Sequence, residues 1–372
     1  MKKIVLIVFG LLGLVIVYLL AWPVPIEPQA WQAPSNPGYT GVFAPNQQLH
    51  TIEQLPLGDQ YGPEEVIVDE QGELYAATHD GWIVRMAADG SAVQNWVQTD
   101  GRPLGLAFDP QGNLIVADAF RGLLQITPAG AVTELATEAD GIPIRYANNV
   151  DVAADGKIYF SDSSTRFAAQ ASGGTYAASL LDIMEHSGTG RLLVYDPATQ
   201  HASTVLDGLN FANGVAVSSD QSSVLVNETG EYRVLRYWRT GPKTGQVEPV
   251  LEALPGFPDN LTRGQDGRYW LALISPRNAL LDRLADKPWL RKVVQRLPAA
   301  LRPKAVHYGH VVAFNESGEV VLNLQDPAGT YPLISAATET DDALYFGSLT
   351  APAVGKLNKD AAGLTNLKTG SE

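Results

Sequence analysis

Short apolar runs alternate with polar turns along most of this 372-residue chain. One unit recurs: an apolar run, a polar turn that ends in glycine, and a second apolar run, as in LAFDPQGNLIVAD. It occupies residues 66–78, 106–118, 150–162, 215–227 (with Gln221 in the glycine position), 261–273 and 311–323. Apolar runs of this length around a tight turn predict β-hairpins, and a regular series of such hairpins predicts a β-propeller.

We therefore expect a six-bladed β-propeller over residues 41–360, whose last blade is completed by strands at 343–347 and 354–357. A β-sandwich is the alternative fold. A sandwich does not keep one repeated unit from residue 66 to residue 323, so the propeller is favoured.

The start of the chain has a different pattern. The run from Ile4 to Trp22 holds no charged residue and follows Lys2 and Lys3. As a helix it is about 28 Å long, close to the hydrocarbon thickness of a bilayer. We expect residues 1–22 to be an uncleaved signal anchor, with the N-terminus cytoplasmic and the propeller on the extracytoplasmic side; a cleaved signal peptide is the alternative. Residues 23–40 are proline-rich and predict an extended spacer, and residues 361–372 predict a tail.

Composition excludes several kinds of function. The absence of cysteine excludes disulfides, zinc–thiolate sites, iron–sulfur clusters and a cysteine nucleophile. The net charge of −14, from 26 basic and 40 acidic residues, argues against a general nucleic-acid partner.

The repeat also predicts a ring of side chains around the propeller axis. If the first strand of each unit is innermost, the positions eight residues before each turn lie at one end of the central channel. These positions are Glu64, Leu104, Asn148, Asn213, Asp259 and His310. Carboxylate and carboxamide oxygens without sulfur suit Ca²⁺. The alternative is that these polar residues only cap turns. Glu65 and Asn149, one residue further on, are candidates for a second, structural Ca²⁺.

Several motifs resemble the strictosidine synthase-like family and its adipocyte plasma membrane-associated branch. They include GPEEV (62–66), GRPLGLAFD (101–109), YANNVDV (146–152), FANGVAV (211–217), LPGFPDNLT (254–262) and LYFGSL (344–349). The resemblance extends to the SMP-30/gluconolactonases and the paraoxonases, and it implies a calcium-dependent six-bladed propeller. It places the metal ligands at Glu64, Asn148, Asn213, Asp259 and Asn260.

Two departures from the wider group bear on the activity. Leu104 stands where paraoxonase-like enzymes have a catalytic histidine, and Ser335 stands where strictosidine synthase has a catalytic glutamate. Strictosidine synthesis is therefore not expected. We expect a Ca²⁺-dependent hydrolase of small esters or lactones, arylesterase- or lactonase-like, with Asp259 as the first candidate for the general base and His310 as the second. The alternative is a non-catalytic binding module that holds a structural Ca²⁺.

Two insertions interrupt the repeat. Residues 166–190 contain a predicted helix at 177–186 that we expect to act as a lid. Residues 277–303 predict a basic amphipathic helix with Trp289, which either lies on an anionic membrane surface or docks on the propeller as a cap.

Overall fold

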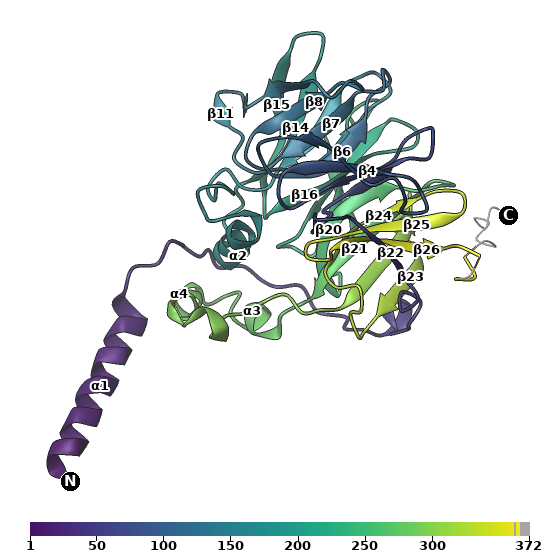
Figure 1. Cartoon of the computed structure of the whole chain (residues 1–372). Helices are drawn as coiled ribbons and strands as arrows, with labels where there is room; N and C mark the ends of the chain where they lie inside the picture. Colours follow the sequence, from purple (N-terminus) through teal and green to yellow (C-terminus); the bar gives the residue numbers. More distant parts are fainter. Residues whose placement is uncertain (361, 365–372) are drawn as a thin grey trace.

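The computed structural model describes residues 1–360 and 362–364, so most of the expected tail at 361–372 lies outside the described residues. The described residues form six four-stranded antiparallel sheets around a central axis (Figure 1). The first strands of neighbouring sheets contact one another around that axis. The predicted six-bladed propeller is therefore confirmed.

The first three blades follow one another along the chain, each from its innermost to its outermost strand. Blade 1 contains β2 (Val66–Val68), β3 (Leu74–Ala77), β4 (Trp82–Met86) and β5 (Gln94–Gln98). Blade 2 contains β6 (Pro103–Phe108), β7 (Leu114–Asp118), β8 (Gly122–Ile126) and β9 (Val132–Ala136). After the short pair β10 (Glu138–Ala139) and β11 (Ile142–Pro143), blade 3 contains β12 (Ala147–Val152), β13 (Ile158–Asp162), β14 (Gly190–Asp196) and β15 (His201–Leu209).

The other three blades complete the ring. Blade 4 contains β16 (Ala212–Val217), β17 (Ser223–Glu228), β18 (Arg233–Trp238) and β19 (Val247–Leu251). Blade 5 contains β20 (Gly256–Arg263), β21 (Arg268–Pro276), β22 (Gly309–Asn315) and β23 (Val320–Asp326). Blade 6 contains β24 (Ile334–Glu339), β25 (Ala343–Ser348) and β26 (Ala353–Asn358). Its outermost strand is β1 (Glu53–Pro56), which precedes blade 1 in the sequence.

Strand β1 closes the ring by pairing with β26. Glu53 lies opposite Lys356 and Pro56 lies opposite Ala353 in an antiparallel register. Backbone hydrogen bonds of β26 that would otherwise be unpaired at a sheet edge are thereby satisfied. The sequence pattern did not predict this strand, because four residues are too few to carry a periodic signal.

The sixth repeat unit was assigned to the wrong strands. Residues 311–323 form β22 and β23, the outer hairpin of blade 5, and blade 6 begins at Ile334. Inner and outer hairpins both join two apolar strands through a polar turn, so their patterns are alike. The true inner turn of blade 6, Thr340–Asp342, lacks the glycine that marked four of the other five inner hairpins.

The innermost strands share an irregularity near their first residues. The pairing register shifts between Ala147 and Val150 in β12, and at the equivalent positions of β6, β16, β20 and β24. A β-bulge releases residues from the ladder and redirects their side chains. The released residues include four of the predicted ring positions, Leu104, Asn148, Asn213 and Asp259. Glu64 directly precedes β2, whose pairing with β3 has no such shift.

Close packing of the innermost strands requires glycine beside this ring. A Cβ atom on Gly214 would lie 2.3 Å from the backbone nitrogen of Leu261, and one on Gly105 would lie 2.6 Å from the Cα atom of Asn149. Neither site has room for a side chain, so the inner strands approach one another more closely than other residue types would allow.

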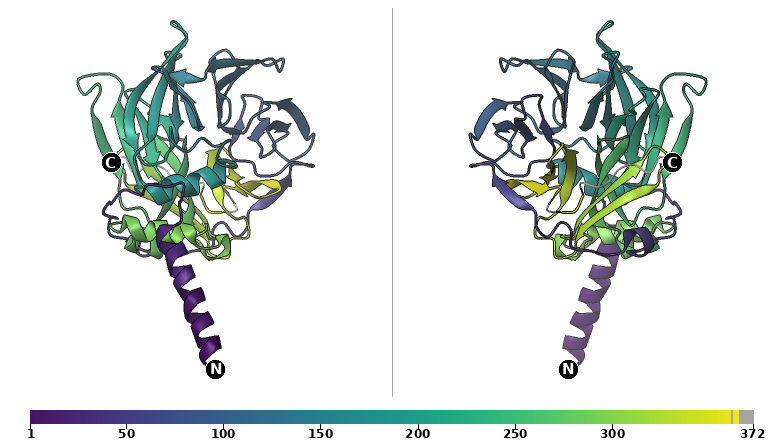
Figure 2. Two further views of the ribbon diagram at one scale, coloured as in Figure 1. Left: turned by 90° about the vertical axis from the view of Figure 1, so that its left-hand side faces the viewer. Right: turned by 90° about the vertical axis from the view of Figure 1, so that its right-hand side faces the viewer.

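Two insertions add helices over one face of the propeller (Figure 2). The first contains α2 (Thr175–Glu185), which matches the predicted helix at 177–186. The second contains α3 (Ala279–Arg283), α4 (Pro288–Arg296) and the 3₁₀ turn η2 (Ala299–Leu301). A further 3₁₀ turn, η1 (Gly41–Phe43), follows the proline-rich spacer.

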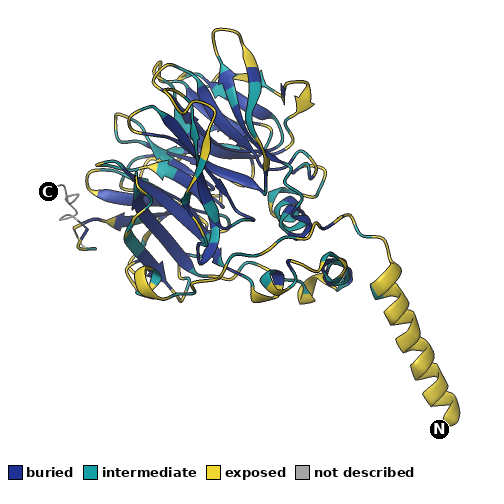
Figure 3. Cartoon of the chain, turned by 180° about the vertical axis from the view of Figure 1, so that it is seen from behind, coloured by how far each residue is buried: buried dark blue, intermediate teal, exposed yellow. Residues whose placement is uncertain are grey.

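The N-terminal helix α1 (Lys2–Ala21) extends away from the propeller and buries none of its residues (Figure 3). Within the described residues, it is the one helix whose length and composition would allow it to cross a membrane. Its end contacts α4: the Tyr18 hydroxyl donates to the Arg296 carbonyl (3.1 Å), and the Arg296 guanidinium donates to the Leu19 carbonyl (2.9 Å).

A buried ion cluster joins blade 5 to blade 6. Glu339, at the end of β24 with a side chain 1% exposed, accepts hydrogen bonds from Arg268 (2.8 and 2.9 Å), Trp270 (2.7 Å) and Lys359 (2.8 Å). Burial alone would raise the pKa of Glu339, but these donors lower it to about 2.

We expect Glu339→Gln to destabilise the fold at neutral pH by about 3 kcal/mol, because it removes the buried anion that pairs with both Arg268 and Lys359. The carboxylate has a lower pKa in the folded protein than in the unfolded chain, so its contribution is complete above the ordinary pKa of glutamate. That contribution is lost as the pH falls through the folded value near 2. Urea unfolding at several pH values should show the gap between wild type and variant closing on acidification. Glu53→Gln, at an exposed position of the same blade, is the control.

Candidate functional site

The bulged starts of β12, β16 and β20, together with the segment just before β2, bring five predicted residues together. Glu64, Asn148, Asn213 and Asp259 lie on the floor of one cavity, and Asn260 lies next to Asp259 with its amide nitrogen 3.4 Å from the Glu64 carbonyl oxygen. All five side chains are buried. They come from four blades, so this cluster exists only in the closed propeller.

Hydroxyl groups directly after the neighbouring strands β13 and β17 orient two of the carboxamides. Asn148 donates from its amide nitrogen to the Ser163 hydroxyl (2.9 Å), and Asn213 donates to the Thr229 hydroxyl (3.2 Å). The Oδ1 atoms of Asn148 and Asn213 are buried without a hydrogen-bond partner among the described residues, and so is that of Asn260. An unpaired buried acceptor costs free energy, so three in one place favour a bound cation.

The two carboxylates of this cluster are held in an unfavourable environment. Burial raises the pKa of Glu64, and the nearby Arg102 guanidinium opposes this shift. Burial, followed by repulsion from Glu64, raises the pKa of Asp259 well above its ordinary value, although a hydrogen bond from Asn213 (2.7 Å) opposes the rise. A divalent cation between the two carboxylates would remove this repulsion.

Arg102 is a site residue that the sequence analysis did not single out. Its guanidinium lies 3.2 Å from the Glu64 carboxylate, and both side chains are buried. Its Nε atom has no hydrogen-bond partner in the part of the chain that the structure describes. Arg102 lies two residues before the ring position Leu104 in the GRPLGL motif, and this closeness could have pointed to it. The repeat itself does not distinguish that position from its neighbours.

His310 does not belong to the ring. It lies on β22, the third strand of blade 5, where its Nε2 atom is 2.9 Å from the Asn323 amide oxygen. Burial lowers its pKa to about 4, so it is neutral at physiological pH. The sixth ring position is Ser335, at the bulge of β24, whose hydroxyl donates to the Glu64 carbonyl (2.6 Å). The displacement follows directly from the misassigned sixth repeat.

Glu65 and Asn149 do not support a second Ca²⁺ in the channel. Glu65 accepts hydrogen bonds from the Leu106 backbone (2.6 Å) and from the Asn149 amide (3.2 Å). The Asn149 amide oxygen accepts from the Val215 backbone (2.7 Å). These atoms already join blades 1 to 4, in contrast to the unpaired oxygens of the ring. Burial raises the pKa of Glu65 to about 8.

The donor set of the ring fits Ca²⁺ better than a transition metal. No group of three or more His, Cys, Asp or Glu side chains suited to a metal occurs among the described residues. A cation here would depend on carboxamide oxygens as well as on Glu64 and Asp259. Neutral and anionic oxygens in a mixed set are typical ligands of Ca²⁺, which accepts six to eight of them.

The cavity above the ring has a volume of about 840 Å³. Its walls come from the inner strands, α2, α4 and the loop at 302–307. Two histidines line it, His79 and His307, neither of which was a predicted site residue. The Nδ1 atom of His79 is 2.7 Å from the Tyr61 hydroxyl, and the two rings are stacked 4.7 Å apart.

Comparison with known proteins identifies the family. Residues 148–242 match the model of strictosidine synthase, and residues 41–86 match that of the N-terminal part of strictosidine synthase-like proteins. An adipocyte plasma membrane-associated protein of Salmo salar is 34% identical over 386 residues, covering 96% of this chain and 90% of that protein. Strictosidine synthase-like 10 of Arabidopsis thaliana is 35% identical over 353 residues, covering 85% and 92%. The chain belongs to the strictosidine synthase-like family.

Solved structures with the same fold include enzymes and a calcium-binding protein. This strictosidine synthase-like chain resembles a gluconolactonase from Xanthomonas campestris with a TM-score of 0.61 and 18% identity, covering 89% of this chain and 98% of that one. It resembles regucalcin, a calcium-binding protein from Agrobacterium tumefaciens, with a TM-score of 0.56 and 12% identity, covering 82% and 93%. At these identities the likeness establishes the propeller fold alone.

We expect Asn213→Ala and Asn148→Ala each to weaken Ca²⁺ binding by at least about tenfold, because each removes one oxygen ligand. Calorimetric titration of the chelator-treated protein would measure this directly. Addition of Ca²⁺ should also raise the Tm of the wild type and raise that of the variants less. Asn95→Ala, on the exposed strand β5, should bind Ca²⁺ like the wild type. Equal affinity in all four proteins would contradict a metal site at the ring.

Proposed function

We propose that this chain is a Ca²⁺-dependent hydrolase of small esters or lactones, anchored in a membrane by α1. The observation that carries the proposal is the cluster of unpaired carboxamide oxygens and repelling carboxylates at the bottom of a cavity. The relation to strictosidine synthase-like proteins and the shared fold of a gluconolactonase support it. A bound Ca²⁺ would polarise the carbonyl oxygen of the substrate.

In this proposal the chain itself supplies the ligands, a base and a partly covered site. Asp259 is the proposed general base: Asn213 holds its Oδ1 atom, and its other oxygen accepts no hydrogen bond from the described residues. Water adds to the carbonyl carbon and the bond to the leaving oxygen breaks. Asp259 takes a proton from the water and gives it to the leaving oxygen. Arg102 offsets the charge of Glu64, and α2 and α4 cover part of the cavity.

A second candidate is a binding module with a structural Ca²⁺. Two ring positions favour it, because Leu104 and Ser335 provide neither an imidazole nor a carboxylate. In that case the cavity would bind a small molecule without converting it. A screen of phenyl esters, p-nitrophenyl esters and lactones, with and without chelator, distinguishes the two candidates.

We expect Asp259→Asn to lower kcat/KM for any hydrolysed ester by a factor of about 10² or more, because the variant cannot accept the proton. Chelator should abolish the same activity in the wild type, and added Ca²⁺ should restore it. His310→Gln, outside the cavity, is the matched control and should change kcat/KM by less than about twofold. Activity that survives both chelator and Asp259→Asn would reject the mechanism.

The anchor can be tested separately, because the chain has no cysteine and any introduced one is unique. Lys3→Cys should react with a membrane-impermeant maleimide only after the membrane is opened, since the basic end of α1 is expected to be cytoplasmic. Ser91→Cys, exposed on the propeller, should react in intact cells or spheroplasts. The opposite pattern would reverse the proposed topology, and release of the protein without detergent would exclude the anchor.

A further inference from the structure

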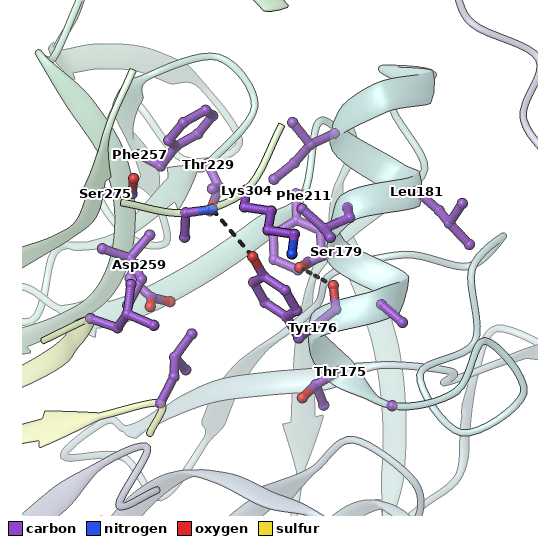
Figure 4. A pocket seen from close by; sticks show the side chains of 18 of the residues that line it. Thr175, Tyr176, Ser179, Leu181, Phe211, Thr229, Phe257, Asp259, Ser275 and Lys304 are labelled. Atoms are coloured by element: carbon purple, nitrogen blue, oxygen red, sulfur yellow. Dashed lines mark hydrogen bonds between the residues drawn. The ribbon is translucent and has the colours of Figure 1, made fainter. Parts of the chain in front are cut away.

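The cavity above the ring is amphipathic. Its floor carries Glu64, Asn213 and Asp259, whereas its walls are mostly hydrocarbon (Figure 4). In that view Phe257 lies on the side of Asp259 and Phe211 lies next to α2. The volume of about 840 Å³ is near the upper end of the range for small-molecule sites, which is roughly 300–1,000 Å³. A substrate as small as an acetate ester would leave much of this apolar wall uncovered.

The apolar walls come from the two inserted helices and the spacer. Met184 of α2, Val294 of α4, Leu281 of α3 and Ile26 of the spacer belong to one hydrophobic cluster with Phe211. Met184, Val294 and Leu281 also line the cavity, and Ile26 is fully buried behind them. The cavity is thus enclosed by elements that other parts of the chain hold in place, not by the propeller alone.

Helix α4 also fixes the end of the membrane helix. The Arg296 guanidinium donates to the Leu19 carbonyl (2.9 Å) and to the Trp22 carbonyl. Tyr18 and Trp22 are aromatic residues at the end of a helix long enough to span a bilayer, which is where such residues meet the lipid headgroups. In the same insertion Trp289 of α4 is 60% exposed and Leu301 of η2 is 66% exposed. The helix that forms one wall of the cavity therefore lies where α1 leaves the membrane.

We propose that the cavity binds a single-chain amphiphile taken from the bilayer. Its carbonyl or carboxylate lies over the ring, and its long hydrocarbon chain lies between α2 and α4. This inference rests on the proposed function for the chemistry of the head group, but the binding of the chain depends only on the cavity. It narrows the substrate class from small esters and lactones to those with a long acyl chain.

Photo-crosslinking in lipid nanodiscs tests the binding of the chain without requiring catalysis. The probe is palmitic acid with a diazirine in mid-chain, added to the full-length, Ca²⁺-loaded protein, and the crosslinked peptides are mapped by mass spectrometry. We expect crosslinks in α2 and α4, at or next to Met184 and Val294, in addition to those on α1 that any membrane helix would give. Crosslinks confined to α1 would overturn the proposal.

A matched pair of variants tests the path of the chain. Val294→Trp places an indole on the proposed path of the chain between α4 and α2, and should reduce the α2 crosslinks by at least about fivefold. Val293→Trp adds the same bulk to α4 at a half-buried position that does not line the cavity, and should leave these crosslinks unchanged. Equal loss in both variants would contradict the assigned path. Should Val294→Trp fail to fold, the crosslink map of the wild type decides alone.

Hydrolysis of p-nitrophenyl acetate, octanoate and dodecanoate separates this proposal from the proposed function. We expect kcat/KM to rise with acyl length, by up to about fourfold per buried methylene. Cavity crosslinks without hydrolysis of any ester would support the ligand class and reject the hydrolase. Hydrolysis that is fastest for acetate, with crosslinks on α1 alone, would support the hydrolase and overturn the long-chain ligand.

Discussion

The arrangement of the molecule depends on the burial of like charges at the propeller axis. Glu64 and Asp259 are removed from water, and the charge of Glu64 adds to the rise in the pKa of Asp259, while three carboxamide oxygens beside them lack donors among the described residues. A site of this kind is unstable by itself, since uncompensated buried charge costs several kcal/mol. Six sheets must converge to hold it, and Arg102 supplies only one compensating charge. The proposed cation would supply the remaining positive charge and the missing partners of the carboxamide oxygens.

The fold meets this requirement through one device used in several blades. A bulge at the start of an innermost strand turns two residues out of the ladder, and the residue directly after the next strand provides a hydroxyl that holds the amide nitrogen. The amide oxygen is then left for the axis. The same bulge occurs in β6 and β24, where Leu104 and Ser335 occupy the equivalent position. Blades 2 and 6 therefore keep the bulged backbone and differ from blades 3 and 4 in the side chain at this position.

The sequence was sufficient for the fold and for most of the ring, because both follow from a local pattern. A strand, a bulge and a hairpin set a constant offset between the turn and Asn148, Asn213 or Asp259. The same offset gave the wrong residue for blade 6. The inner turn of that blade, Thr340–Asp342, has no glycine, and the outer hairpin of blade 5 has the pattern expected of an inner hairpin. Arg102, His79 and His307 could not be found in this way, since they lie on segments without a repeat. The contact of α4 with α1 joins residues about 275 positions apart, and no local pattern reports it.

The pairing of β1 with β26 also has a consequence for biogenesis. Its partners lie about 300 residues apart in the chain, so the closing contact has one of the longest sequence separations in the molecule. During synthesis residues 53–56 must stay without this partner until residues 353–358 have emerged. Throughout that interval both edges of the incomplete ring are exposed, and edge strands are the sites at which chains aggregate. Because β26 is synthesised last, the exposed edge of β1 is covered only when synthesis of the propeller is complete.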